Sequence, residues 1–167
     1  MPSALHMALD NVDMQAAVKR SRKLLNKRAL VAAAASAIPV PGLDWAVDAA
    51  LLSKLIPEIN KEFGLTPEQL DSLSPKKREQ VQKAVTLVGS VLIGKLISKD
   101  LVLKAATTIG VRLTTKQLAK YVPFAGQIVA ATVGYAAIRY LGEEHMKDCI
   151  LVAQKAGLDV PKLGYSG

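Results

Sequence analysis

A hinge rich in proline and glycine interrupts an almost continuous apolar segment of the chain. The segment at 28–55 reads RALVAAAASAIPVPGLDWAVDAALLSKL, and its hinge is the tetrapeptide PVPG at 39–42. Proline lacks a backbone donor and restricts the residue before it, so one helix must end near Ile38. A second helix can begin after Gly42, with Asp44 close to its positive end. Because both arms are apolar nearly all round, we expect a helical hairpin buried in a core or in a membrane.

The same kind of hinge recurs near the end of the chain. Pro123 and Gly126 stand in the segment VPFAG and repeat the spacing of Pro39 and Gly42. Two interpretations are open. Either the chain contains two related helical hairpins, or each helix pair uses Pro and Gly independently because these residues favour turns. Under both interpretations the hinge residues are Pro39, Pro41, Gly42, Pro123 and Gly126.

Helical periodicity fills most of the chain, and no segment shows the apolar–polar alternation of a half-buried strand. A chain of 167 residues is long enough for one domain with a core of its own. Half of the residues are hydrophobic but only 4% are aromatic, so Ala, Val, Leu and Ile must form that core. We predict an all-α, single-domain bundle of about six to eight helices without a β-sheet. The domain should cover 1–157, and 158–167 should form a C-terminal tail.

Capping residues and helix breakers divide the chain into expected helices. Thr66 before Pro67 has the pattern of an N-cap followed by proline in the first turn, Ser74 before Pro75 marks the next helix start, and Gly64 is a stop signal. Pro57 should kink or split the helix that contains it. The expected helices cover about 3–27, 28–38 (the first arm of the hairpin), 43–63, 67–73, 75–97, 100–110, 114–121 and 125–155.

The first expected helix, over 3–27, is cationic and amphipathic. The first 28 residues carry six basic and two acidic side chains, in a chain of net charge +8. Such a helix can lie on an anionic membrane, whereas the alternative is an ordinary solvated face above a core-facing stripe. Nucleic acid is disfavoured as a partner because no aromatic side chain lies in a basic patch. The candidate membrane- or anion-facing residues are Lys19, Arg20, Arg22, Lys23, Lys27 and Arg28.

No segment has the pattern of a transmembrane helix. The uncharged run at 121–138 is shorter than the roughly 20 apolar residues that a span requires, and Pro123 breaks it near one end. We expect it to be a core helix, with membrane insertion after opening of the bundle as the alternative. The single cysteine, Cys149, excludes an intrachain disulfide and fits a reducing compartment. We therefore expect a cytoplasmic protein, at most peripherally bound to a membrane.

One segment matches a nucleotide-binding pattern in part. Residues 89–95 read GSVLIGK and have the spacing of a phosphate-binding loop. However, Leu96 stands where a Ser or Thr must reach magnesium, and no strand precedes the glycines. A helical pattern instead runs through the whole segment. We therefore interpret the two glycines as sites of close helix packing.

The remaining candidate groups favour structural roles. Asp44 and Asp48 lie four residues apart, as in acid–base or metal sites, but no third ligand is evident. We expect Asp48 to be a buried polar residue with a partner, and Trp45 to be a core anchor or an interface residue. Cys149 has no histidine at a recognised spacing and should be a small buried hydrophobe. The sequence thus predicts no catalysis, no cofactor and no metal.

The two hinge regions resemble known helical domains. The segments at 35–44 and 48–52 resemble the helical domain of immunity-related GTPases. The segments at 122–127 and 134–139 resemble bacterial EcsC-type proteins and the helical domains found beside bacterial GTPases. The resemblance implies a helical domain that associates with membranes or with a GTPase and has no catalysis of its own. The phosphate loop and α/β pattern of a GTPase domain are missing from the sequence, which argues against nucleotide binding.

Three hypotheses of function follow from these patterns. The first is a non-enzymatic α-helical module that associates peripherally with an anionic membrane. The second is a soluble interaction or oligomerisation adaptor for a GTPase or another protein, with a homo-oligomer as one form of it. The third is an effector that forms pores by inserting its apolar hairpins into a membrane.

Overall fold

The computed structural model describes residues 3–36, 43–94, 97–98, 100–102, 104 and 127–162, with side chains at 3–31, at 138–162 and at the described residues from 51 to 104. These ranges contain helices, turns and loops and no strand, which confirms the predicted all-α fold. The helices are α1 (Ala4–Met7), α2 (Val12–Ser36), α3 (Leu43–Glu62), α4 (Pro67–Asp71), α5 (Pro75–Val88) and α8 (Gln127–Ala156).

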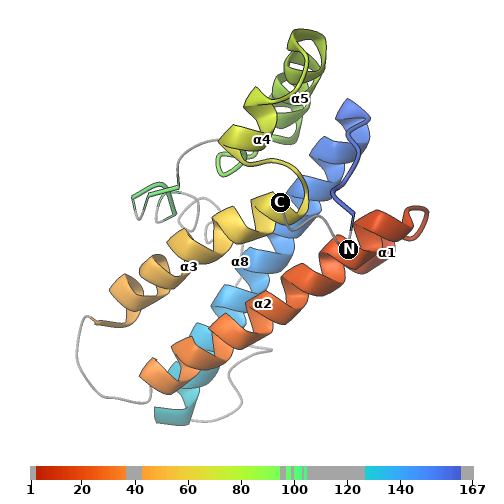
Figure 1. Cartoon of the computed structure of the whole chain (residues 1–167). Coiled ribbons are helices and arrows are strands. Elements are labelled where there is room, and N and C mark those ends of the chain that lie inside the picture. Colours follow the sequence, from red (N-terminus) through yellow and green to blue (C-terminus); the bar gives the residue numbers. More distant parts are fainter. Residues whose placement is uncertain are drawn as a thin grey trace.

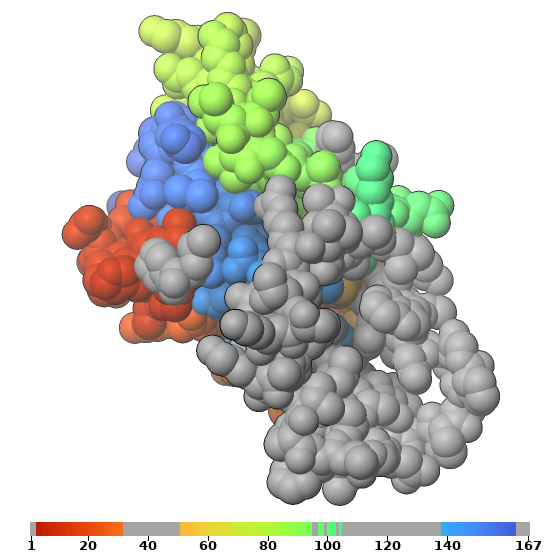
Figure 2. Space-filling view, turned by 180° about the vertical axis from the view of Figure 1, so that it is seen from behind, coloured from red at the N-terminus to blue at the C-terminus, as the bar shows by residue number. Residues whose placement is uncertain are grey.

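Three long helices, α2, α3 and α8, lie side by side and contact one another in pairs (Figure 1). Helix α8 also packs against α1 and α5, so it is the central element of the described fold. Figure 2 shows from the opposite side that the α4–α5 segment, in yellow-green, projects beyond the rest of the molecule. The largest fully buried side chains of the three-helix core include Leu25, Leu55, Ile59, Phe63, Met146 and Ile150.

Helices α2 and α8 pack closely against each other at Gly142. A Cβ atom on this residue would lie 2.5 Å from Leu25 Cδ1, which is closer than two carbon atoms can pack. Leu25 is itself fully buried and has no solvent-filled space to move into. Glycine is therefore the residue that allows this helix crossing.

The N-terminal segment contains two helices, so the prediction of one helix over 3–27 is wrong. Ser3 caps α1, and the chain turns after Met7. Asn11 then starts α2, because its side-chain oxygen accepts a hydrogen bond from the Met14 N–H at 3.0 Å. Helix α1 has already ended at Met7, with Ala8 as its C-cap, and the Asn11 N–H donates to the Ala8 carbonyl at 3.1 Å in the turn between the helices. Helix α2 then continues to Ser36, so it joins the predicted first helix to the first arm of the hairpin, which was expected to end near Ile38.

Helix α3 runs through Pro57 without a break, so of the two predicted effects of this proline the split is wrong, while a kink stays a prediction. Leu55, Ile56 and Ile59 around the proline are buried, and their packing offsets the missing backbone hydrogen bond. The predicted stop at Gly64 is confirmed, because this residue has a φ of +75° and the Leu65 N–H donates to the Asn60 carbonyl at 2.9 Å.

The starts of α4 and α5 follow the predicted caps. Thr66 accepts a hydrogen bond from the Gln69 N–H at 3.2 Å, and the Gln69 side chain accepts one from the Thr66 N–H at 3.1 Å. This reciprocal pair is a capping box, with Pro67 in the first turn. Ser74 caps α5 by accepting a hydrogen bond from the Lys77 N–H at 3.3 Å, with Pro75 in the first turn.

Helix α5 ends at Val88, so the prediction of a helix from 75 to 97 is wrong. Gly89 adopts a left-handed conformation with φ of +77°, which terminates the helix. The following residues, 89–94, form a non-helical segment, here called the 89–94 loop. Leu92 and Ile93 of this loop turn into the core and are only 8% and 2% exposed. Burial of these two side chains favours the loop over a longer, solvent-exposed helix.

The predicted last helix over 125–155 is confirmed by α8, which ends before Gly157. The hinge residues Pro39, Pro41, Gly42, Pro123 and Gly126 lie outside the described residues, as does most of the region expected to form helices over 100–110 and 114–121. Within the described ranges, no helix is both long and apolar enough to span a membrane.

Candidate functional site

Helix α2 carries an exposed line of three lysines. Lys19, Lys23 and Lys27 are exposed and follow one another at intervals of four residues, so they lie on the same side of the helix. At 1.5 Å per residue, their backbone positions span about 12 Å. None of the ion pairs found in the described part of the chain includes one of these lysines.

Exposed apolar side chains continue the same side of α2 at both ends of the lysine line. Val12 is 80% exposed at one end, and Leu30 and Val31 are 62% and 52% exposed at the other. At 100° per residue, positions 12, 19, 23 and 30 fall in one narrow stripe, and positions 27 and 31 lie about 60° and about 100° to one side of it. We call this surface the lysine face; it consists of Val12, Lys19, Lys23, Lys27, Leu30 and Val31.

The three arginines of the basic cluster turn towards the bundle instead. Arg20 pairs with Glu62, and Arg28 pairs with Glu58 at 3.5 Å, so both connect α2 to α3. Arg22 binds both carboxylate oxygens of Glu143 on α8, at 2.6 and 3.2 Å. Fixed pairs of this kind neutralise each other and orient the helices.

Glu143 also accepts a hydrogen bond from the Ala4 N–H at 2.9 Å, so its carboxylate joins α1, α2 and α8. Partial burial acts to raise the pKa of Glu143. The hydrogen bonds from Arg22 and Ala4 and the charges of Arg22 and Lys147 outweigh burial and lower that pKa. The carboxylate is therefore kept ionised as part of the scaffold.

A second group of polar side chains is buried inside the bundle. Asn60 of α3 and His145 and Cys149 of α8 are 1%, 2% and 0% exposed. His145 Nε2 lies 2.7 Å from Asn60 Oδ1, and Cys149 Sγ lies 3.5 Å from the same histidine nitrogen. The thiol is buried as predicted, but it does have a histidine partner, one helical turn away. Burial raises the pKa of the Cys149 thiol, and the charge of Asp148 adds to this effect, so the thiolate is disfavoured.

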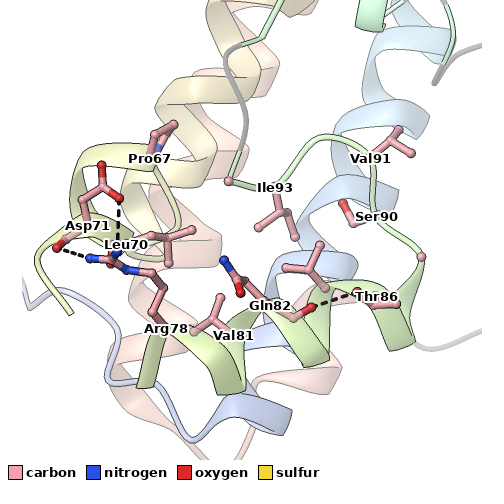
Figure 3. A pocket seen from close by; sticks show the side chains of 13 residues that line it. Pro67, Leu70, Asp71, Arg78, Val81, Gln82, Thr86, Ser90, Val91 and Ile93 are labelled. Atoms are coloured by element: carbon pink, nitrogen blue, oxygen red, sulfur yellow. Dashed lines mark hydrogen bonds and ion pairs between the residues drawn. The ribbon is translucent and has the colours of Figure 1, made fainter. Parts of the chain in front are cut away.

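A pocket of about 490 Å³ lies between α4, α5 and the 89–94 loop (Figure 3). Leu70, Val81 and Ile93 form apolar parts of its wall, and Gln82 points between them. At one end, the Arg78 guanidinium donates to the backbone carbonyls of Leu70 and Asp71 at 3.2 and 2.6 Å. Arg78 thus caps the C-terminal end of α4, and its hydrogen-bonding groups are largely used by the protein itself.

The part of the phosphate-loop-like segment that the structure describes is the non-helical wall of this pocket. Gly89 and Gly94 both have positive φ, at +77° and +73°. Helix α5, rather than a strand, precedes the loop. The arrangement therefore differs from a nucleotide-binding loop, as the sequence predicted, although the helix expected there is absent.

The structure thus separates the sequence-predicted residues into groups. The lysines of the basic cluster are exposed and the arginines are paired. The backbones of Trp45 and Asp48 belong to α3, while their side chains are outside the described set. Sequence reasoning missed Asn60, and its only signal was an amide residue among the buried apolar positions of a helix.

Comparison with known proteins finds a distant similarity to interferon-inducible GTPases. The chain is 26% identical over 137 residues to interferon-inducible GTPase 5 of Rattus norvegicus and, to the same extent, to that of Bos taurus. The matched region covers 79% of this chain but only 29% of each relative, so the chain spans less than a third of their length. No protein-family model matches the sequence. No solved structure matches it either.

This similarity agrees with the GTPase-related part of the resemblance seen in the first hinge region. The resemblance of the second hinge region to EcsC-type proteins stays a prediction.

Proposed function

We propose that this chain is a non-enzymatic helical module that binds the surface of an anionic membrane through the lysine face of α2. The observation that carries the proposal is the exposed line of Lys19, Lys23 and Lys27, with Leu30 and Val31 beside it. A helix with this composition lies flat on a membrane, with its lysines at the headgroups and its apolar side chains at the acyl boundary. The distant relation to interferon-inducible GTPases supports a role for the module in a GTPase-related system.

The separation of lysines from arginines sharpens this proposal. Arg20, Arg22 and Arg28 each have a carboxylate partner within the bundle. Their charges are largely neutralised locally, whereas those of the lysines remain available to an external anion. Each lysine near an anionic bilayer contributes about 1 kcal/mol of attraction, so the three contribute roughly 3 kcal/mol.

Binding to lipid vesicles in a salt series tests the proposal. The triple variant Lys19→Gln, Lys23→Gln, Lys27→Gln should bind vesicles that contain anionic lipid about 100-fold more weakly than the wild type at low salt. Binding of the wild type should also weaken as salt increases, because the interaction is electrostatic. Vesicles of neutral lipid should bind neither protein strongly.

A matched control removes the same charge from other elements. Lys54, Lys76 and Lys162 are exposed on α3, on α5 and after α8. Their joint replacement by glutamine lowers the net charge equally but leaves the lysine face intact. If this control loses as much binding as the lysine-face variant, only overall charge matters and the proposed surface is wrong. Absence of binding between the wild-type protein and anionic vesicles at low salt would also contradict the proposal.

The similarity to interferon-inducible GTPases favours a second candidate function, an adaptor that binds a GTPase. Full-length interferon-inducible GTPase 5 from rat is a defined probe. Calorimetric titration with this protein, loaded with GDP or with a non-hydrolysable GTP analogue, should show binding that depends on the nucleotide. Absence of binding in both nucleotide states would argue against this candidate.

A further inference from the structure

One asparagine side chain joins three separate segments in the core. The Asn60 Nδ2 amide of α3 donates to the backbone carbonyl of Leu92 in the 89–94 loop at 2.9 Å. Its Oδ1 atom lies 2.7 Å from His145 Nε2 of α8 and 3.6 Å from Cys149 Sγ. The three side chains are at most 2% exposed, so water does not compete for these contacts.

This arrangement fixes the tautomer of His145. The carbonyl of Leu92 can only accept, so the Asn60 amide nitrogen must face it and the Asn60 oxygen must face His145. Because that oxygen also only accepts, the hydrogen of the neutral imidazole is on Nε2. Nδ1 is left with a bare lone pair, and it is buried without a hydrogen-bond partner in the described part of the protein.

We infer that Asn60 and His145 form an acid-sensitive latch that holds α3, α8 and the 89–94 loop together at neutral pH and releases them when His145 is protonated. A proton on Nδ1 creates a buried N–H donor without an acceptor among the described residues, and a buried charge without a counter-ion among them. Both are unfavourable in the core, so protonation requires that the latch open to water.

In the part of the chain that the structure describes, the carboxylates on the elements around the latch are already engaged elsewhere. On α3, Glu58 and Glu62 are paired with Arg28 and Arg20 of α2. On α8, Glu143 and Glu144 are paired with Arg22 and Lys147. The adjacent Asp148 has interactions of its own, and the thiol of Cys149 is kept neutral by burial. On α5, Glu79 is paired with Lys83 at an exposed position.

The pH range follows from the two states of the histidine. Burial lowers the pKa of His145 from 6.5 to about 4 in the closed protein. As pH falls below 6.5, the open state takes up a proton first, so its population rises relative to that of the closed state. The latch is therefore at full strength above 6.5 and weakens progressively as pH falls towards about 4.

Cys149 provides a direct readout, because it is the only cysteine of the chain and touches the latch. The rate at which Cys149 reacts with 4,4′-dithiodipyridine is measured in native protein and divided by the rate in the urea-unfolded chain at the same pH. We call this ratio the accessible fraction of the thiol. Between about pH 7.5 and about pH 5, the accessible fraction in the wild type should rise about 30-fold. An unchanged accessible fraction in the wild type would overturn the proposal.

Two variants separate the latch from general effects of acid. His145→Gln keeps a donor for Asn60 but does not titrate, so its accessible fraction should be independent of pH in this range. His6→Gln removes the other histidine, which is exposed, and should behave as the wild type does. A His145→Gln variant with the wild-type response to acid would contradict the assignment of the sensor to His145.

A second test keeps His145 in place, so it does not depend on whether the His145→Gln variant folds. In the His6→Gln variant, the only histidine signal in a proton NMR titration belongs to His145. We expect this signal to stay at its neutral position down to about pH 5, where the closed form still holds the ring uncharged. Titration of this signal above about pH 6 would show that the ring is accessible in the native state and would overturn the latch.

Discussion

At the scale of single residues, the contact between Gly142 and Leu25 limits how the central helices can pack. The site for a Cβ atom on Gly142 is already occupied by the side chain of Leu25, with two Leu25 atoms at 2.5 and 2.7 Å. Both residues lie in the closely packed interface between α2 and α8. A single methyl group at this point must therefore push the two helices apart or displace a buried leucine.

We predict that Gly142→Ala lowers the free energy of unfolding by about 1–3 kcal/mol, the usual cost of overpacking a core. Urea denaturation at neutral pH measures this change. The double variant with Leu25→Ala should show a smaller loss than the sum of the two single variants, because the clash is then absent. Additive losses, or a stable Gly142→Ala protein, would contradict the packing described for α2 and α8.

At the scale of elements, short-range signals in the sequence predicted several helix ends correctly. Thr66, Ser74 and Gly64 act within a few residues of their own positions, so their effects could be read without the tertiary structure. Asn11 and Gly89 were missed because each lies inside a continuous helical pattern. Whether such a residue lies inside a helix or at its end depends on which neighbouring side chains become buried. After Gly89, these are Leu92 and Ile93.

The Thr66 cap gives a test at the level of one helix. We predict that Thr66→Ala lowers the free energy of unfolding by about 1 kcal/mol, because the Gln69 N–H loses its acceptor. Thr66→Ser should retain most of the stability, since a serine hydroxyl accepts the same hydrogen bond. Equal effects of the two substitutions in thermal or urea unfolding would show that the capping box adds no stability.

Glu143 connects three helices and predicts a pH dependence. Its pKa is lowered in the folded protein, so its contribution is present above the ordinary value of 4.5 and is lost as pH falls through the lower folded pKa. Glu143→Gln should lower the free energy of unfolding by roughly 1 kcal/mol at neutral pH, since the site is partly exposed and solvent screens the pair.

The difference between wild type and Glu143→Gln should shrink as pH decreases below about 4.5, because the unfolded wild type then binds the proton first. Urea titrations of both proteins at several acidic pH values measure it. Other acidic groups and His145 are common to both proteins and cancel in the comparison. A difference that stays constant on acidification would show that the Arg22–Glu143 pair does not stabilise the fold.

At the scale of the whole molecule, the structure shows which side chains from distant parts of the chain meet, and the sequence could not predict this. The sequence identified six basic residues as one cluster, but only the positions of α3 and α8 decide which of them meet carboxylates. The arginines meet Glu58, Glu62 and Glu143, and the lysines are left on the outer side of α2. The Asn60–His145 contact was equally invisible, because it joins residues 85 positions apart in the chain.

The central claim is that the lysine face of α2 lies against an anionic membrane. A fluorophore sensitive to polarity, attached through Leu30→Cys, tests it most directly, while the buried Cys149 stays unlabelled in native protein. A matched label at Gln80→Cys on the exposed side of α5 is the control. The account predicts that vesicles of anionic lipid at low salt shift the emission of the label at residue 30 to the blue and leave the label at residue 80 unchanged. Equal responses of the two labels, or no response at residue 30, would contradict it.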